Sequence, residues 1–142
     1  MKIAIINGPN LNLLGKREPS VYGNTSFETY FEQLQSKFPS IDLVHFQSNI
    51  EGELIDALQL HGFDSAGIII NPGGYTHTSV AIGDAIAAIA APVIEVHISN
   101  IHAREDFRKI SHVSAKAAGT IAGLGLSGYA LAIDWFINLK GA

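Results

Sequence analysis

The chain of 142 residues contains no cysteine, and only 15% of its residues are charged. The missing cysteine excludes a disulfide framework, a thiolate nucleophile and a cysteine-based metal site. The 9 basic residues form no long run, and the 13 acidic residues outnumber them to give a formal net charge of −4. Proteins that bind nucleic acids need clustered positive charge against the phosphates. We therefore expect no nucleic-acid partner.

Long apolar segments are also missing. The longest one, residues 85–94, contains Pro92 and is too short to cross a bilayer. Only four consecutive apolar residues precede Asn7, which is too few for a secretory signal. We therefore expect a cytoplasmic protein without a membrane partner.

Several motifs of metal and cofactor enzymes are absent or incomplete. The six histidines show no spacing typical of metal ligands, and there is no G-x-S-x-G sequence of a serine hydrolase. A G-x-G-x-x-G sequence occupies residues 123–128, but the second strand and the acidic residue of a dinucleotide site do not follow it. Residues 8–19 contain no Ser or Thr, unlike a flavin-phosphate loop. The sequence therefore indicates no metal and no cofactor.

What is present suits one α/β domain. The composition is 47% hydrophobic with 14 glycines, and 142 residues are enough to enclose one core. No linker, repeat or low-complexity segment divides the chain, so we expect a single domain over residues 1–142.

Apolar segments and helical periodicity alternate along the chain. The segments that predict buried parallel strands are residues 3–6, 41–46, 66–70, 93–96 and 120–122. Helices are predicted at residues 25–38, 48–62, 78–90 and 127–138, the first two from capping-box sequences that begin at Thr25 and Ser48. This alternation predicts a flavodoxin-like, doubly wound five-stranded parallel sheet with strand order 2-1-3-4-5.

Polar sequences follow the first, third and fourth predicted strands, at residues 7–10, 71–73 and 95–97. In a doubly wound sheet, ligands bind beyond the carboxyl ends of the strands, where the strand order reverses. The loop at residues 7–23, which carries Arg17 and Tyr22, is long enough to be a lid or a binding loop. We therefore expect one functional site at this edge of the sheet.

Glu95 and His97 are two residues apart on a predicted strand, so their side chains should point to the same face. A carboxylate beside a histidine can orient the ring and fix its tautomer, which suits His97 as a general acid. Alone, the pair fits a structural role equally well. Beside Asn10, Arg17 and Tyr22, the catalytic interpretation is favoured.

Three further residues are candidates for binding. Residues 73–79 are expected to open a helix whose backbone amides favour an anion or hydroxyl groups, and His77 in this turn could bind a polyhydroxylated ligand. The hydroxyl side chains in the same turn could simply cap the helix. Asp84 would ordinarily be a surface acid on that helix, and Arg108 could reach a ligand carboxylate.

Five motifs occur in order along the chain. They are Gly8-Pro-Asn-Leu-Asn-Leu-Leu-Gly15, Arg17-Glu-Pro19 with Tyr22-Gly23, Asn71-Pro-Gly73 with Tyr75-Thr-His-Thr-Ser79, Glu95-Val-His-Ile-Ser-Asn100 and Arg104-Glu-Asp-Phe-Arg108. With this combination, essentially the whole chain resembles type II 3-dehydroquinate dehydratase. The departures are modest, and none falls on an assigned residue. At Gly83 a larger residue is usual, and the glycine could loosen the helix that carries Asp84.

The resemblance implies a reaction and catalytic roles. Members of that family dehydrate 3-dehydroquinate to 3-dehydroshikimate, a step of the shikimate pathway, by an anti elimination through an enolate. By this resemblance Tyr22 is the base that removes the C2 proton, Arg17 stabilises its phenolate, and His97 is the acid for the C1 hydroxyl. Asn10 positions a water at the enolate oxygen, and Glu95 positions the His97 ring.

The resemblance also implies binding residues and an assembly. The groups that bind substrate would be Asn71, His77, Arg108 and the backbone of Ile98 and Ser99. Asp84 would come from a neighbouring subunit of a trimer, four of which form a homododecamer. The nearly all-apolar helical sequence at residues 130–137 independently favours an oligomer, because one sheet face cannot cover it.

Two other functions stay open. One is a flavodoxin-like flavin- or phosphate-binding module, and the other is a non-catalytic scaffold. A colourless protein that binds no flavin would argue against the first, and turnover of 3-dehydroquinate would argue against the second.

Overall fold

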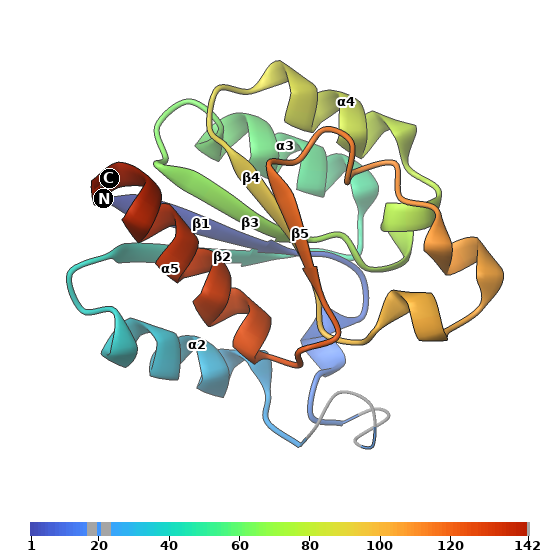
Figure 1. The fold of residues 1–142 in the computed structure, drawn as a ribbon, viewed down its shortest axis with the longest axis horizontal. Coiled ribbons are helices and arrows are strands. Elements are labelled where there is room, and N and C mark those ends of the chain that lie inside the picture. Colours follow the sequence, from blue (N-terminus) through green and yellow to red (C-terminus); the bar gives the residue numbers. More distant parts are fainter. Residues whose placement is uncertain (17–19, 21–23, 142) are drawn as a thin grey trace.

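Five parallel strands form one sheet in the order β2-β1-β3-β4-β5 (Figure 1). They are β1 (Lys2–Asn7), β2 (Asp42–Gln47), β3 (Gly67–Asn71), β4 (Val93–His97) and β5 (Gly119–Ala122). The order and the parallel pairing confirm the predicted doubly wound, flavodoxin-like sheet. The computed structural model describes residues 1–16, 20 and 24–141, so Arg17 and Tyr22 lie outside the described residues.

α-Helices cover both faces of the sheet. On one face lie α2 (Phe27–Lys37) and α5 (Ser127–Gly141), and on the other lie α3 (Glu51–His61) and α4 (Val80–Ala88) (Figure 1). In the part of the chain that the structure describes, no helix is long and apolar enough to cross a membrane.

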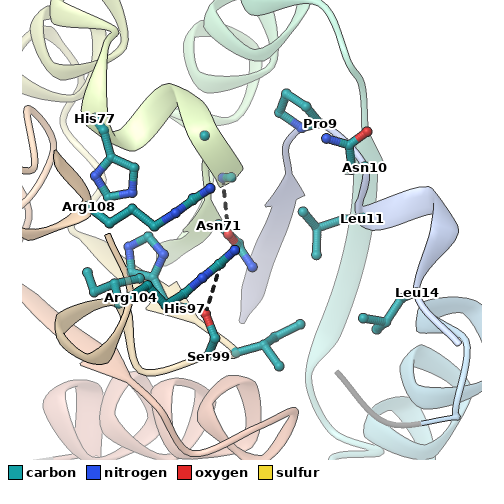
Figure 2. Close-up of a pocket in the computed structure, with 14 residues that line it drawn as sticks. Pro9, Asn10, Leu11, Leu14, Asn71, His77, His97, Ser99, Arg104 and Arg108 are labelled. Atoms are coloured by element: carbon teal, nitrogen blue, oxygen red, sulfur yellow. Dashed lines mark hydrogen bonds between the residues drawn. The ribbon is translucent and has the colours of Figure 1, made fainter. Parts of the chain in front are cut away.

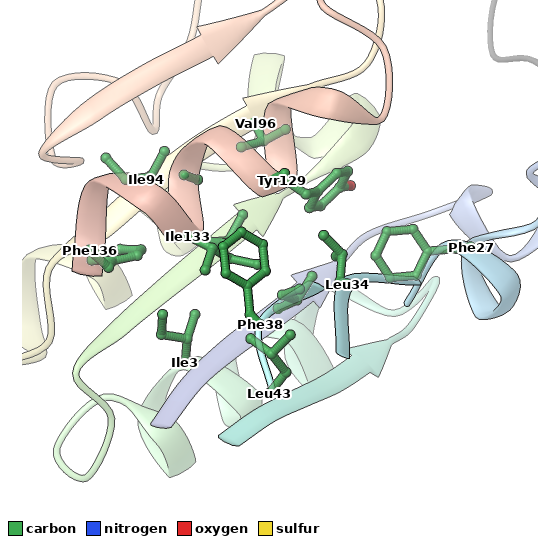
Figure 3. Close-up of a cluster of buried hydrophobic side chains, with 14 of the residues drawn as sticks. Ile3, Phe27, Leu34, Phe38, Leu43, Ile94, Val96, Tyr129, Ile133 and Phe136 are labelled. Atoms are coloured by element: carbon green, nitrogen blue, oxygen red, sulfur yellow. The ribbon is translucent and has the colours of Figure 1, made fainter. Parts of the chain in front are cut away.

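Alternate residues of each central strand pack on opposite faces. Ile3 and Ile5 of β1 pack with α2 and α5, whereas Ala4 and Ile6 pack under α3 and α4. Figure 3 shows the first of these clusters, in which Phe136 of α5 is fully buried. Burying one such side chain contributes about 1.5–3 kcal/mol. Coverage on both faces explains why β1 is a continuous apolar run rather than an alternating one.

Two helix starts differ from the prediction. Helix α2 begins at Phe27, and Ser26 rather than Thr25 caps it by accepting a hydrogen bond from the Thr29 amide at 3.2 Å. Ser48 does not begin a capping box, because its Oγ accepts from the Ile50 amide at 2.9 Å and closes a turn before α3. Adjacent hydroxyl residues and a turn just outside a helix give the same local sequence signal as a cap, so sequence alone did not separate them.

The segment after β3 also differs. Residues 73–79 do not open α4 but form a separate 3-10 helix, η2 (Gly73–His77), and α4 starts only at Val80. Ser79 caps α4 by accepting from the Ile82 amide at 3.0 Å, which confirms capping for one of the hydroxyl residues of this turn. The Gly73 amide donates to Asn71 Oδ1 at 3.1 Å and is therefore not free for an anion.

The connection from β4 to β5 crosses the sheet without an α-helix, within residues that are all described. Within residues 98–118, all of which are described, the chain forms two 3-10 helices, η3 (Ile101–Ala103) and η4 (Asp106–Lys109), and no α-helix. Residues 110–118 then return along the sheet, held by the amides of His112 and Ala118, which donate to the Thr76 and Val93 carbonyls at 2.9 and 2.7 Å. We call residues 110–118 the covering segment.

Gly83 lets the covering segment approach α4. A Cβ at this position would collide with the His112 carbonyl oxygen. Gly83 is buried, so the glycine permits close packing next to Asp84.

We expect Gly83→Ala to lower the free energy of unfolding by about 1–3 kcal/mol, because a backbone oxygen must shift to make room. The matched control is Gly52→Ala on α3, where a Cβ would meet no described atom within 4 Å. That change should raise stability by up to about 1 kcal/mol through helix propensity. Urea denaturation of both variants at one protein concentration measures the difference, and equal effects would contradict the packing argument.

Candidate active site

A cavity lies at the carboxyl ends of β1, β3 and β4, the edge at which the sequence predicts a site (Figure 2). Its walls come from the loop after β1, from η2 and from the loop after β4. The residues that line it are Pro9, Asn10, Leu11, Leu14, Asn71, Gly73, Gly74, His77, His97, Ile98, Ser99, Ile101, Arg104 and Arg108.

Most of the predicted residues are at this cavity. Seven of them line it, namely Asn10, Asn71, His77, His97, Ile98, Ser99 and Arg108. Glu95 contacts His97 and is fully buried. Asp84 is exposed on α4 and does not line the cavity that the described residues form. The roles predicted for Arg17 and Tyr22 fall on residues outside the described part of the chain.

Glu95 and His97 form a hydrogen-bonded pair at the end of β4. His97 Nε2 lies 2.5 Å from Glu95 Oε2, and both side chains are buried on the same face of the strand. Because Nε2 is held by the carboxylate, Nδ1 is the ring nitrogen left to act on a ligand. The pair therefore has the geometry in which a carboxylate orients a histidine for proton transfer.

The Glu95 carboxylate is ionised despite its burial. Burial acts to raise its pKa, but hydrogen bonds from His97, Ser114 and Ser111 outweigh it, and the pKa lies below the ordinary value for Glu. Hydrogen bonds donated to a carboxylate favour its charged form. His97 thus faces the negative charge of the buried Glu95 carboxylate.

His77 is a second ring at the cavity. Its Nδ1 lies 2.6 Å from the Ile110 carbonyl, which can only accept, so the proton is on Nδ1. Burial lowers the pKa of His77 although the bond to Ile110 acts in the opposite direction. The neutral ring leaves Nε2 as a hydrogen-bond acceptor, and it stacks on His97 with centroids 6.5 Å apart.

Two arginines supply positive charge to the cavity (Figure 2). Arg108 pairs with Glu105 and lies over the Phe107 ring at 5.1 Å, while Arg104 Nη1 reaches Ser99 Oγ at 3.4 Å. Arginine forks bind carboxylates well, so this side of the cavity suits an anionic ligand. Of the two, only Arg108 is among the residues predicted from the sequence, although Arg104 lies four residues away in the same loop.

The loop after β1 brings Asn10 to the cavity in a strained conformation. Asn10 has a φ of 71°, in the left-handed region that few residues other than Gly and Asn adopt. Its backbone amide donates to Asn49 Oδ1 at 3.0 Å, and Gln47 Nε2 donates to the Gly8 carbonyl at 3.2 Å. The end of β2 therefore fixes the first turn of this loop, and with it the position of Asn10.

Under the cavity, hydrogen bonds join the ends of β1 and β3 to α5. Asn71 Nδ2 donates to Tyr129 Oη at 3.2 Å, and Tyr129 Oη donates to Asn7 Oδ1 at 2.8 Å. Asn7 Nδ2 lies 3.1 Å from His45 Nε2. All these side chains except His45 are buried. We call Asn71, Tyr129, Asn7 and His45 the amide chain.

The direction of every bond in the amide chain follows from one end. The Gly73 amide can only donate, so Asn71 Oδ1 accepts from it and Asn71 Nδ2 must donate to Tyr129. His45 at the other end accepts from Asn7, which requires an unprotonated Nε2, and burial does lower the pKa of His45. Asn71 therefore keeps one N–H for the cavity, and it offers a donor to a ligand oxygen.

The site thus combines a histidine oriented by a carboxylate, a second and neutral histidine, an amide donor and two arginines, which suits proton transfer on an anionic substrate. Residues 1–137 match the sequence profile described as dehydroquinase class II. The chain belongs to the class II dehydroquinase family. This membership confirms the resemblance stated from the motifs, and it decides against the flavin- or phosphate-binding module.

Relatives in this class II dehydroquinase family match nearly the full length. A protein of Exiguobacterium sp. named 3-dehydroquinate dehydratase is 56% identical over 139 residues, covering 97% of this chain and 95% of the relative. One of Roseiflexus castenholzii with the same name is 50% identical over 143 residues, covering 99% and 91%. The crystal structure of type II dehydroquinase from Butyrivibrio crossotus shares 48% identity at a TM-score of 0.92, covering 96% of this chain and 97% of that one.

We expect Tyr129→Phe to lower the free energy of unfolding by about 2–4 kcal/mol. The change leaves Asn7 Oδ1 and Asn71 Nδ2 buried without their partner, at about 1–3 kcal/mol each. The control is Tyr75→Phe, which loses one exposed bond to the Asn49 carbonyl and should cost about 1 kcal/mol or less. Urea denaturation at a fixed protein concentration makes the comparison, and equal losses would refute the structural role of the amide chain.

Proposed function

We propose that this chain is a 3-dehydroquinate dehydratase, which eliminates water from 3-dehydroquinate to give 3-dehydroshikimate. The observation that carries the proposal is the buried Glu95–His97 pair at a cavity that also contains two arginines. Family membership and the names of the relatives support the same reaction.

The reaction removes a proton from C2 and a hydroxyl from C1 of the substrate. Tyr22 is proposed as the base that takes the C2 proton and leaves an enolate, and Arg17 is proposed to stabilise the Tyr22 phenolate. His97 then gives a proton to the C1 hydroxyl, which leaves as water. Asn10 holds a water at the enolate oxygen, and Glu95 keeps the His97 ring in place. The elimination of water causes no net oxidation or reduction of the substrate, so the reaction needs no redox cofactor.

Residues from different walls of the cavity are proposed to bind the substrate. Arg108 and the backbone of Ile98 and Ser99 are proposed to bind the carboxylate and nearby hydroxyls, since all three line the cavity. Asn71 donates its remaining N–H to a substrate oxygen, because its other polar positions are used within the amide chain. His77 Nε2 accepts a hydrogen bond from a substrate hydroxyl, because the proton of the ring is on Nδ1.

The assembly proposed is a trimer-based homododecamer in the cytoplasm. Asp84 is exposed on α4 and outside the cavity of its own subunit, which leaves it available to a neighbouring one. Helix α5 exposes Leu131, Trp135 and Leu139 at four-residue spacing, an apolar stripe that suits contact between subunits.

We expect the wild-type protein to convert 3-dehydroquinate. The ultraviolet absorbance of the conjugated product measures the rate. His97→Gln should lower kcat by about 10²–10⁴-fold, because it removes the general acid. His102→Gln is the control, since His102 is exposed on η3 and does not line the cavity formed by the described residues. It should leave kcat within about twofold. A wild-type protein without turnover would refute the proposed function, and equal effects of the two variants would refute the role of His97.

The proposed trimer predicts active sites that are shared between subunits. Asp84→Asn and His97→Gln proteins should each be poorly active, and should regain up to a quarter of the wild-type activity after they are dissociated together and reassociated. Recovery follows because some sites then combine an intact His97 with an intact Asp84 from the neighbour. Asp56→Asn, an exposed acid on α3, is the control and should keep activity by itself. No recovery, or a fully active monomer in sedimentation, would contradict the proposed trimer.

A further inference from the structure

The Glu95 carboxylate is surrounded by hydroxyl groups that no part of the proposed reaction uses. Ser111 and Ser114 come from the covering segment, and Thr120 is the residue of β5 that pairs with Glu95 across the sheet. Glu95 itself is 0% exposed. The covering segment and β5 thus supply the polar environment of a charge that the apolar core cannot stabilise.

Ser111 builds the turn above Glu95. Its Oγ accepts from the amides of Val113 and Ser114 at 3.1 and 3.0 Å, which uses both lone pairs. The remaining proton is therefore directed at the carboxylate, whose Oε2 and Oε1 lie 3.2 and 3.4 Å away. This turn also brings Ser114 over the same carboxylate.

Ser114 and Thr120 contact one oxygen of Glu95 in particular. Ser114 Oγ donates to Oε1 at 2.5 Å, and Thr120 Oγ1 lies 3.3 Å both from Oε1 and from Ser114 Oγ. His97 contacts the other oxygen, Oε2. The two hydroxyls therefore fix the rotation of the carboxylate and leave Oε2 facing the histidine.

We propose that Ser114 and Thr120 are positioning residues of the dehydratase, which hold Glu95 ionised and turned toward His97. The inference rests on the proposed function, because it assigns them a role in presenting the general acid. Neither residue lines the substrate cavity formed by the described residues, so they act only through Glu95.

Removing a hydroxyl donor to Glu95 should make kcat fall at a higher pH than in the wild type. Among the described residues, the titratable side chains that interact with Glu95 are His97 on its own strand and His77 from η2, while β3 places Ile70 beside it. Donated hydrogen bonds hold the pKa of Glu95 below its usual range against the effect of burial. Removing a donor raises that pKa, so Glu95 loses its charge at a higher pH as the solution is acidified. The loss of kcat at low pH must move upward with it.

The experiment compares kcat against pH for the wild type, Ser114→Ala, Thr120→Val and the double variant. We expect the acid limb to move up by about half a pH unit or more in each single variant and further in the double variant. KM at neutral pH should stay within about twofold, since the substrate contacts are unchanged. Ser114→Thr keeps a hydroxyl and should restore the wild-type limb. Ser36→Ala, an exposed serine of α2, is the matched control.

A second readout does not need turnover. The carbonyl stretching band of the protonated Glu95 carboxyl, assigned with Glu95→Gln, gives its titration in the same variants by infrared spectroscopy. Variants that lose stability or kcat but keep the wild-type acid limb and titration would overturn the inference, because their role would then be structural only. A wild-type protein that leaves 3-dehydroquinate unchanged would refute the proposed function instead, and the infrared titration would still decide the ionisation of Glu95.

Discussion

One hydroxyl group, that of Tyr129, holds the floor of the site together. It joins the carboxyl ends of β1 and β3 through Asn7 and Asn71, and it does so from a helix on one face of the sheet. Strand ends carry backbone and side-chain polar groups that cannot be left unpaired in a buried place. By satisfying both asparagines at once, α5 sets the spacing of two strand ends from which the loops of the cavity depart. The start of η2 is tied to this junction through the Gly73 amide, which donates to Asn71 Oδ1.

The polar interactions at the site are of two kinds, neutral and charged. The amide chain is neutral throughout, since its tyrosine is protonated and its histidine uncharged, and so it fixes geometry without adding a net charge to the cavity. The charges are gathered on the other side, where Glu95 lies under His97 and the arginines line the wall. The arginines thus favour an anionic substrate at the cavity that His97 also lines.

The sequence predicted the parts of the fold that depend on local patterns. Continuous apolar runs identified β1 and β3 because both faces of those strands are covered, and the two-residue spacing of Glu95 and His97 placed both on one face. Interactions between distant residues left no local signal. Tyr129 bonds to Asn7 across 122 positions, and Ser114 and Thr120 reach Glu95 across 19 and 25. A serine in a surface turn looks the same in sequence whether it contacts water or a buried carboxylate.

Within the described residues 98–118, no α-helix lies between β4 and β5. This affects how long Glu95 stays shielded from water. A helix packed on the core would hold its backbone by a continuous series of internal hydrogen bonds, which the covering segment lacks. A surface turn opens by local unfolding, at a free energy well below that of global unfolding. Water can then reach the carboxylate from behind while the substrate cavity keeps its shape. The fraction of time for which Glu95 is shielded from water therefore depends on the local opening of the covering segment, and two proteins of the same melting temperature could differ in it.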